Sequence, residues 1–515
     1  MIFHIGTLNP LLSLQNVRII SRTKRKQVNK MEAKPKYVGL ITAAILLSTF
    51  MSAIEGTVIS TAMPTIIGSL HGIKLMSWVF SIYMLMTAVA TPIYGKLSDL
   101  IGRKPAMLSG LIIFLIGSMM SGVSDSMGTL IFWRAIQGIG AGGIMPVAFT
   151  ILADLYPIEK RASIMGLNST AWGVASMVGP LVGGYLVQNL SWHWVFFINL
   201  PIDIITIAIL IFFYKDTFEK RQAIIDYPGV LWMSVFIVGL LLGLQMISEA
   251  NWLLMVIFFV ASVLGLVLFI KRERKAPEPL IDLKMFKSVD FTAANTIAGL
   301  TAGFIIAYNI YLPTWMQALG GMKPSVAGFV VIPSSVVWMF GAVISGRVLA
   351  KHSAQYLFKF SLFVGMLYAI MLAVMPGDAP FVLFLATGLI FGLTMGSTIT
   401  ASTVMAQQTV EPSQIGMATS FNNLARAMVQ TMMTTVYGVV LNVSMSIALQ
   451  SHHNLHFAEL NQLIDPNTAK NLPASHIAPL RDIMTFGLHN IYWVGALLML
   501  GAVLTNVWAT RQLKK

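Results

Sequence analysis

Long apolar runs separated by short polar segments make up most of this chain. Each of fourteen such runs has about 20 residues, and a helix of that length crosses the roughly 30 Å hydrocarbon core of a lipid bilayer. The pattern therefore predicts an all-α polytopic membrane protein with 14 transmembrane helices. The predicted spans lie at about 38–62, 76–95, 106–124, 128–151, 163–188, 194–214, 228–247, 252–271, 291–313, 324–346, 356–375, 380–404, 417–444 and 487–510.

The composition also indicates a membrane protein, and it excludes cysteine chemistry. Of the 515 residues, 56% are hydrophobic and 10% are charged, which leaves too few polar side chains to cover a soluble protein. Cysteine is absent, so neither disulfides nor thiolate metal sites are available.

The distribution of lysine and arginine predicts the direction of the spans. With the N-terminus inside the cell, the predicted inner segments hold 28 of the 34 cations, the outer segments hold 4, and Arg134 and Arg426 fall within spans. This excess on one side follows the positive-inside rule, so we expect both termini in the cytosol. The net charge of +14 then reflects contact with anionic headgroups rather than nucleic-acid binding.

The spans fall into groups of six, two and six. Residues 1–30 precede a second methionine, Met31, and are either part of the cytosolic tail or an upstream start-site artefact. The predicted organisation is a basic cytosolic tail at 1–37, an N-terminal six-helix half at 38–214, an inserted helix pair and linker at 215–290, a C-terminal six-helix half at 291–510 and a cytosolic tail at 511–515.

A long loop at 445–486 lies outside the membrane in this topology. His452 and His456 would share one face of a helix there, with His453 beside them. A metal site and solvated loop histidines both fit this spacing, and we expect the second, with no metal bound.

A charged, glycine-bearing turn at Gly95–Pro105 joins two spans. Gly95 and Gly102 permit tight backbone turns, and Asp99 can cap a helix and pair with Arg103. The spelling resembles the loop signature G-x-L-x-D-x-x-G-R-K/R of the major facilitator superfamily. The resemblance implies two six-helix halves and a conformational switch, in which Asp99 faces the N-terminus of the span at 417–444 and Arg103 and Lys104 belong to the same switch loop. The alternative is a basic turn that only sets topology.

A second copy of this loop at 346–351 keeps the glycine and the cations but has Ala350 where the first copy has Asp99. At the inner end of the span at 128–151, Asp154 with Glu159 and Arg161 resembles the second charged cluster of that family. A salt-bridged gate and an ordinary solvated loop are both open there.

Glu55 is the only charge between Val38 and Leu70. A lone intramembrane carboxylate costs several kcal/mol unless it is paired or protonated, which makes a functional role the default expectation. Residues 55–64 resemble the signature L-D-x-T-I/V-V/I-N/S-x-A-x-P of fourteen-helix drug:proton antiporters of EmrB/QacA type, with Glu55 in place of the usual aspartate. The resemblance implies a proton carrier, and a structural acid is the alternative.

Arg134 opens the string at 134–143, which resembles the motif R-x-x-Q-G-x-G-x-A/G of the same family. A guanidinium in a membrane interior needs an acceptor and can hold a carboxylate in its ionised form, so we assign Arg134 to the proton relay beside a purely structural alternative. The glycines also spell a dinucleotide fingerprint, but no strand precedes them. Asp203 is a second buried acid, which is either another proton site or a water-facing residue at a helix end.

The span at 163–188 contains a glycine and proline pattern that resembles G-x-x-x-G-P-x-x-G-G, the signature that separates exporters from importers in this superfamily. Generic helix packing is the alternative explanation. The residues are Gly173, Gly179, Pro180, Gly183 and Gly184.

Soft, aromatic and polar side chains on the central spans are candidates to line a substrate cavity, because such side chains suit varied apolar cargo. They are Tyr83, Met86, Gln137, Asn168, Trp172, Tyr308, Asn309 and Trp338.

These features together predict a proton-coupled multidrug efflux antiporter that exports amphipathic or cationic compounds by alternating access. The alternatives are a transporter of one physiological solute and a non-transporting membrane sensor. We expect no enzymatic activity and no cofactor, with the proton gradient as energy source. We expect a monomer in the bacterial inner membrane, without nucleic-acid partners.

Overall fold

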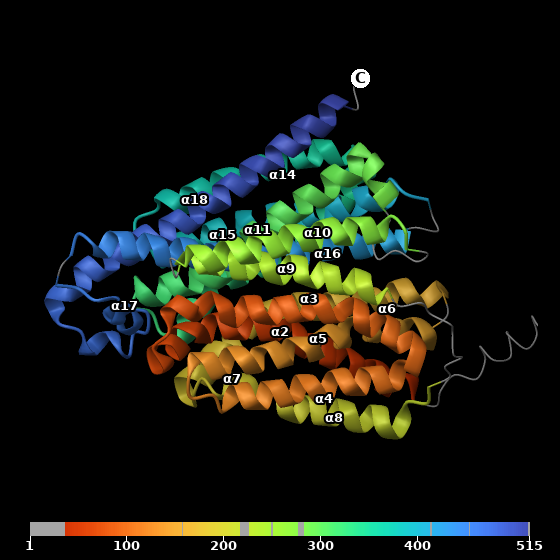
Figure 1. The fold of residues 1–515 in the computed structure, drawn as a ribbon, viewed down its shortest axis with the longest axis horizontal. Coiled ribbons are helices and arrows are strands. Elements are labelled where there is room, and N and C mark those ends of the chain that lie inside the picture. Colours follow the sequence, from red (N-terminus) through yellow and green to blue (C-terminus); the bar gives the residue numbers. More distant parts are fainter. Residues whose placement is uncertain are drawn as a thin grey trace, which may run out of the picture.

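The computed structural model describes residues 37–156, 158–216, 226–248, 251–276, 283–411, 415–452 and 454–512. Within these residues the protein is helical and contains no β-strand (Figure 1). The side chains of Asp99, Arg161, Asn168 and Trp172 lie outside what is described, although their backbones belong to helices.

The long helices follow the predicted spans closely. Thirteen helical stretches of the described chain are long and apolar enough to cross a membrane. The predicted span at 163–188 corresponds to α6, which is richer in glycine, serine and asparagine but is 32 residues long, well beyond the length that a bilayer requires. The helices are α2 (Val38–Leu70), α3 (Met76–Ile101), α4 (Arg103–Gly122), α5 (Met127–Leu155), α6 (Ile158–Asn189), α7 (Trp194–Phe197), α8 (Asn199–Phe213), α9 (Tyr227–Ser248), α10 (Trp252–Glu273), α11 (Val289–Ala318), α12 (Pro324–Gly328), α13 (Ile332–Leu349), α14 (Ala354–Val374), α15 (Phe381–Gln408), α16 (Ile415–Leu449), α17 (Phe457–Leu463) and α18 (Ala474–Gln512).

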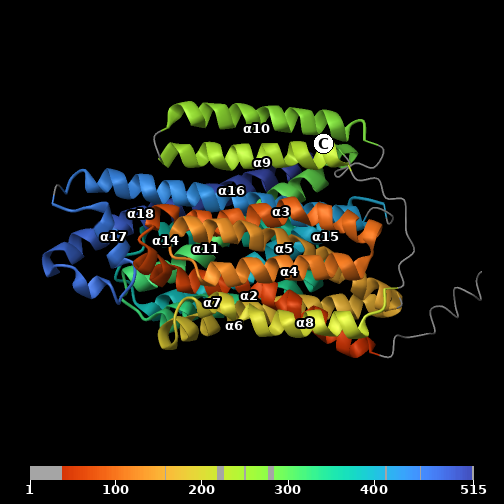
Figure 2. The same ribbon diagram turned by 60° about the horizontal axis from the view of Figure 1, so that its bottom comes forward.

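Two bundles and a flanking pair make up the arrangement in space. Helices α2 to α8 lie together in one half, and α11 to α18 lie together in the other (Figure 1). Helices α9 and α10 pack on each other along one flank, where α9 touches α16 and α3 (Figure 2). Arg272 Nε and Asp226 Oδ1, 2.7 Å apart, join the ends of this pair.

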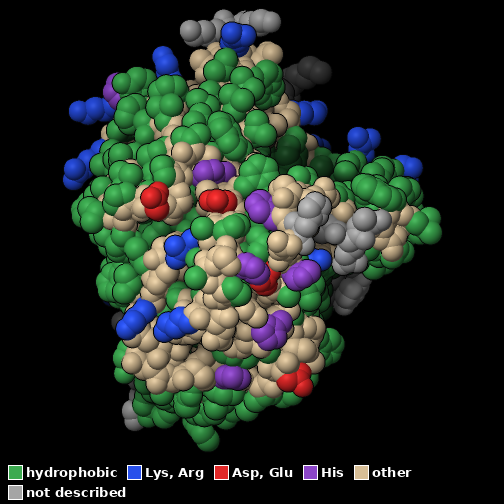
Figure 3. All heavy atoms as spheres, turned by 90° about the vertical axis from the view of Figure 1, so that its left-hand side faces the viewer, with side chains coloured by type: hydrophobic (Ala, Val, Ile, Leu, Met, Phe, Trp, Pro, Cys, Tyr) green, Lys and Arg blue, Asp and Glu red, His purple; other side chains and the backbone are tan. Residues whose placement is uncertain are grey.

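The outer surface of the bundle is apolar, as a membrane requires. Large side chains such as Phe212, at 77% exposure, and Leu253, at 73%, face outward. Soluble proteins rarely expose so much contiguous apolar surface. The bundle face at which α17 lies, which we call the α17 end, instead carries histidines and other polar groups (Figure 3).

The two halves touch at the α17 end. Gln317 Nε2 of α11 donates to the Thr61 carbonyl of α2 at 3.0 Å. The Ile73 backbone N–H donates to Asn461 Oδ1 of α17 at 2.8 Å. Asn442 Nδ2 of α16 donates to the Lys74 carbonyl at 3.0 Å. These bonds cross between the N-terminal and C-terminal halves, so this end of the bundle is closed.

The loop predicted at 445–486 is largely helical, which corrects its extent. Helix α16 runs on to Leu449, and α18 begins at Ala474. Between them, α17 begins after His456, whose backbone N–H donates to Glu459 Oε2 at 2.8 Å, as in a capping box. Residue His453 lies outside the described part of the chain.

The turn predicted at Gly95–Pro105 is also shorter than expected. Helix α3 continues through Ile101, and the break comes at Gly102, which has a φ of 102°. Because that φ lies in the left-handed region, glycine suits the position and other residues are strained there. The polar residues before it stay helical, and Ser98 Oγ donates to the Gly95 carbonyl at 2.7 Å.

Candidate functional site

Glu55 lies in the middle of α2 and forms a buried ion pair. Its Oε1 is 2.6 Å from Arg134 Nη1 of α5, and the side chains of both residues are 1% exposed. An isolated charge of either sign at this depth is costly, so each residue makes the burial of the other possible. The structure thus brings together two of the residues that the sequence suggested for proton coupling.

Two amide side chains complete the surroundings of the Glu55 carboxylate. Gln137 Nε2 donates to Glu55 Oε1 at 2.9 Å, and Asn199 Nδ2 donates to Glu55 Oε2 at 2.9 Å. The Gln137 carbonyl oxygen accepts from Arg134 Nη1 at 2.7 Å, and Arg134 Nε donates to the Val79 carbonyl at 3.2 Å. Residues of α5 and α8 therefore meet at the Glu55 carboxylate of α2, and α3 joins the cluster through Arg134.

Local geometry explains how these side chains converge. Arg134 and Gln137 are three residues apart on α5 and so share a face of that helix. Asn199 is the first residue of α8 and follows α7 after one residue, Ile198, whose backbone is also helical. Its Nδ2 also donates to Ser118 Oγ of α4 at 2.9 Å, and Ser118 Oγ donates to the Phe196 carbonyl at 2.8 Å. This chain of hydrogen bonds fixes Asn199 beside Glu55.

Tyr83 of α3 covers the Arg134 guanidinium. The guanidinium carbon lies 4.0 Å from the centre of the Tyr83 ring, a cation–π contact, and the tyrosine is half-buried. Met86, also half-buried, lies one turn along the same helix, close to Gly138 of α5. Tyr83 is therefore more exposed than either charged residue of the ion pair.

Asp203 lies one turn beyond Asn199 on α8. It is 1% exposed, and neither carboxyl oxygen has a hydrogen-bond partner in the described residues. It interacts electrostatically with Glu55, so the two acidic groups are near neighbours. An ionised Asp203 would be a buried charge without a partner, which is unfavourable. The three residues proposed for proton coupling therefore form one cluster.

The glycines of α6 allow two close helix contacts. A Cβ on Gly179 would lie 2.0 Å from Thr57 Oγ1, and one on Gly183 would lie 2.8 Å from the Val58 carbonyl, so both glycines face α2 just beyond Glu55. Gly184 faces the other half, where a Cβ would lie 2.3 Å from Ser325 Cα.

Pro180 also faces the C-terminal half, with its carbonyl beside Gly328, whereas Gly173 has ordinary space, because a Cβ there would lie 3.6 Å from Met339 Sδ. Gln188 and Ser325 are hydrogen bonded across the same contact. The predicted exporter signature therefore lies along the contact of α6 with α2 and with the second half.

The residues predicted as a switch lie together at the opposite end of the bundle. Arg103 Nε is 3.0 Å from Asp154 Oδ2 of α5. The Lys104 backbone N–H donates to Asp216 Oδ2 at 2.9 Å, and its Nζ donates to the Ile211 and Tyr214 carbonyls. Gly95 has open space around it. The predicted contacts of Asp99 and Arg161 involve side chains that lie outside the described part of the structure.

The candidate lining residues occupy different settings. Tyr308 is fully buried, stacks on Phe391 with ring centres 4.0 Å apart and donates to the Val330 carbonyl, so it packs inside the second half. Gln137 is committed to Glu55 and Arg134. Asn309 and Trp338 are half-buried. The side chains of Asn168 and Trp172 are not described.

Asn199, Ser118 and Asp216 are the site residues that sequence reasoning missed. Asn199 belongs to the stretch 192–201, which is mostly aromatic and aliphatic and overlaps the start of the predicted span at 194–214. Its role depends on the packing of α8 against α2, which the local amino-acid sequence does not indicate.

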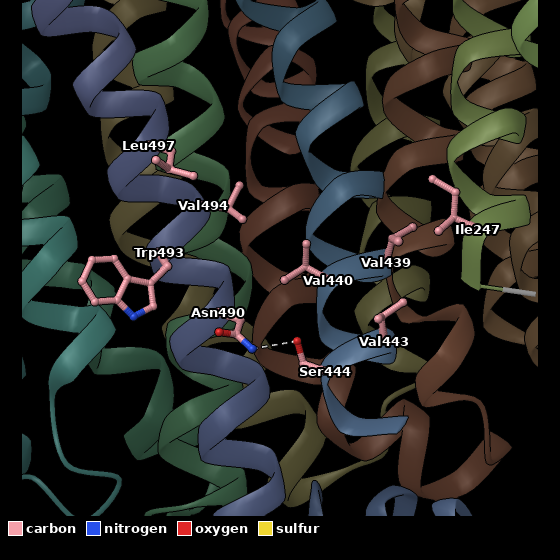
Figure 4. A pocket seen from close by; sticks show the side chains of 9 residues that line it. All are labelled: Ile247, Val439, Val440, Val443, Ser444, Asn490, Trp493, Val494 and Leu497. Atoms are coloured by element: carbon pink, nitrogen blue, oxygen red, sulfur yellow. Dashed lines mark hydrogen bonds between the residues drawn. The ribbon is translucent and has the colours of Figure 1, made fainter. Parts of the chain in front are cut away.

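Outside this cluster of charged residues, the described part of the chain offers an apolar groove and no metal-binding group. Among the described residues, no group of three histidine, cysteine or acidic side chains could hold a metal ion. A groove of about 410 Å³ between α9, α16 and α18 is almost entirely apolar, with a hydrogen bond from Asn490 to Ser444 (Figure 4). It is lined by Ile247, Val439, Val440, Val443, Ser444, Asn490, Trp493, Val494 and Leu497.

Comparison with known proteins agrees with this architecture. Multidrug resistance protein 3 of Bacillus subtilis is 35% identical over 414 residues, which cover 79% of this chain and 80% of the relative. Multidrug transporter protein MdtP of the same organism is 30% identical over 510 residues, covering 92% and 93%. Multidrug efflux pump SdrM of Staphylococcus aureus is 31% identical over 421 residues, covering 80% and 92%.

Solved structures show the same fold at lower identity. A bacterial homologue of the human lysosomal transporter Spinster, in an inward-facing and occupied conformation, aligns with a TM-score of 0.65 at 15% identity, covering 92% of this chain and 97% of that one. A D-xylose–proton symporter aligns with a TM-score of 0.58 at 14% identity, covering 90% and 97%.

The family profile described as Major Facilitator Superfamily matches residues 45–434, which is most of the chain. That match, the relatives and the helical fold agree, and they confirm the fold class expected from the sequence. The chain therefore belongs to the Major Facilitator Superfamily, whose members are multi-pass membrane transporters and not enzymes.

Proposed function

We propose that this protein exports amphipathic, often cationic compounds in exchange for protons. Three relatives that cover most of the chain are named as multidrug resistance, multidrug transporter or multidrug efflux proteins, which supports drug-like cargo. The observation that carries the proton-coupling part is the buried ion pair between Glu55 and Arg134.

Protonation of Glu55 gives the ion pair a direct role in coupling. The carboxylate is the member of the pair that can take up a proton, because a guanidinium stays protonated. A proton on Glu55 removes the attraction to Arg134 and leaves a net positive charge among α2, α5 and α8. Asp203, close to Glu55 and without a partner, is part of the same proton-binding cluster in this proposal.

Alternating access turns that change of charge into transport. The closed α17 end, together with the concentration of cations at the other end, supports a state that is closed to the outside, with both chain termini in the cytosol of a bacterium. Each proton that moves inward releases about 2.3 kcal/mol per 100 mV of membrane potential. That free energy drives outward movement of the cargo.

The inner loop is the switch in this mechanism. The Arg103–Asp154 ion pair and the bond from Lys104 to Asp216 tie α4 to α5 and to the end of α8. Asp99, with Arg161, keeps the switching role that its motif implies. The transporter works as a monomer in the inner membrane, needs no cofactor, and moves a solute without transforming it.

Everted membrane vesicles test the proposal. In vesicles that have been acidified by respiration, an added cationic drug should release protons when native protein is present. The Glu55→Gln variant, which cannot carry the proton, should release none, and Glu55→Asp should retain release. Proton release by Glu55→Gln equal to that of the native protein would remove Glu55 from the coupling. No drug-stimulated release by the native protein with any tested cation would remove the antiporter assignment itself.

A further inference from the structure

The two carboxylate oxygens of Glu55 are held in different ways. Oε1 accepts from Arg134 Nη1 at 2.6 Å and from Gln137 Nε2 at 2.9 Å. Oε2 accepts from Asn199 Nδ2 at 2.9 Å and from no other described group. Since a guanidinium can only donate, a proton on Oε1 would face a donor that cannot change its role. Oε2 is therefore the oxygen at which Glu55 can take up a proton.

A protonated Oε2 needs an acceptor, and Asn199 carries one. In the charged state its Nδ2 donates to Oε2, while its own carbonyl oxygen, Oδ1, is buried without a hydrogen-bond partner in the described structure. A half-turn of the amide about the Cβ–Cγ bond exchanges the positions of Nδ2 and Oδ1. The same side chain then accepts the hydrogen bond of the protonated acid.

Neighbouring groups allow Asn199 to make this turn and prevent Gln137 from making it. The Gln137 carbonyl oxygen already accepts from Arg134 Nη1 at 2.7 Å, so its amide is fixed as a donor to Glu55. Ser118 Oγ, by contrast, accepts from Asn199 and donates to the Phe196 carbonyl. A hydroxyl is both donor and acceptor, so it can rotate and donate to Oδ1 after the turn.

We propose that Glu55 carries its proton on Oε2 and that Asn199 is a positioning residue that turns its amide to bind both charge states. The inference rests on the proposed function and deepens its proton step. One proton moves from water to Oε2, and no other covalent bond changes. The charged or titratable groups that face Glu55 are Arg134 from α5, Tyr83 from α3 and Asp203 from α8. Asp203 lies one turn along α8, and both of its carboxyl oxygens are buried without a hydrogen-bond partner among the described residues.

Infrared difference spectroscopy of the full chain in liposomes tests the position of the proton. Spectra at acid and alkaline pH are subtracted, and the carboxylic acid band that is lost in Glu55→Gln belongs to Glu55. If the proton is on Oε2, the C=O bond is the one to Oε1, and its stretch is lowered by the donors on Oε1. Gln137→Leu should then raise that frequency more than Asn199→Leu does. The opposite order would place the proton on Oε1 and overturn the proposal.

The pH midpoint of the same band tests the amide turn. Gln137 donates to Oε1 in both charge states, and its hydrogen bond to the charged carboxylate is the stronger one, so Gln137→Leu should move the midpoint upward by about one pH unit. Asn199 stabilises both forms, so Asn199→Leu should move it by clearly less. An equal upward shift in both variants would show that Asn199 is a fixed donor like Gln137 and does not turn its amide. Asn199→Ser, whose hydroxyl can donate and accept, should keep a midpoint near that of the native protein and guards against a misfolded leucine variant.

Drug-stimulated proton exchange in the same liposomes separates this inference from the proposed function. If exchange is normal and the two leucine variants shift the pH midpoint equally, only the amide turn of Asn199 is rejected. Absence of exchange in the native protein rejects antiport, and the band still reports which oxygen carries the proton. If no Glu55 band appears between alkaline and acid pH, Glu55 takes up no proton, and both the site on Oε2 and the role of Asn199 are rejected.

Discussion

Replacement of Gly184 by alanine should push the two halves apart at the α17 end. A Cβ at this position would lie 2.3 Å from Ser325 Cα and 2.7 Å from Ser325 N, both of them backbone atoms that cannot rotate away. Carbon atoms in good contact are about 3.5–4.0 Å apart. Helices α6 and α12 must therefore separate by about 1.2–1.7 Å, or the closed contact must open.

The size of the effect follows from the cost of overpacking. Extra methyl groups in well-packed sites typically cost about 1–3 kcal/mol. If that cost is felt only in the closed state, the ratio of closed to open protein falls by about 5- to 150-fold. Gly173→Ala is the matched control, because it lies on the same helix and its Cβ would meet Met339 Sδ at an ordinary 3.6 Å.

A single cysteine can report the opening, since the chain has none of its own. Thr434 of α16 is 0% exposed and its hydroxyl lies 3.8 Å from Met84 Sδ of α3, across the boundary between the halves. Thr434→Cys should react slowly with a membrane-impermeant maleimide, and faster when combined with Gly184→Ala. If Gly184→Ala and Gly173→Ala give the same labelling rate, the steric reasoning is wrong.

Two further predictions concern the same end of the molecule. Gln188 and Ser325 are hydrogen bonded across the halves. The double variant Gln188→Cys with Ser325→Cys should therefore form a disulfide that stops drug export until a reductant is added. Continued export by the oxidised protein would show that this end need not open. Partial burial alone would raise the pKa of Glu459, but hydrogen bonds from the His456 backbone N–H and the His476 ring outweigh it and hold that pKa below its usual value of 4.5. The stabilisation of the folded protein is present above pH 4.5 and is lost as the pH falls through the lowered pKa. Glu459→Gln should therefore lower the thermal unfolding temperature at pH 7 but not near pH 3. An equal decrease at both pH values would contradict this pH dependence.

The spans were predictable from the sequence because burial in lipid imposes one requirement along each of them. A run of about 20 apolar residues is needed whatever its neighbours are. The ends were less predictable. The helix continues through Gly95 and stops at Gly102, where the backbone takes a positive φ.

Part of the candidate site was visible in the sequence for a similar reason. Glu55 and Arg134 are charges in apolar runs, and such residues need partners. Asn199 was not visible, since a polar residue at the start of a helix is common and has no need of a distant acid. Its bond to Glu55 exists because α8 packs against α2, 144 positions away in the chain. The contact of Gly184 with Ser325 likewise depends on how the halves meet.

Uphill transport in liposomes tests the central claim most directly. Purified protein is reconstituted, a pH gradient is imposed, and accumulation of a labelled cationic drug against its own gradient is measured for the native chain and for Glu55→Gln. We predict accumulation by the native protein and none by Glu55→Gln, while the variant retains exchange of labelled for unlabelled drug because its cargo path is intact. Accumulation by Glu55→Gln at the native rate would contradict the account.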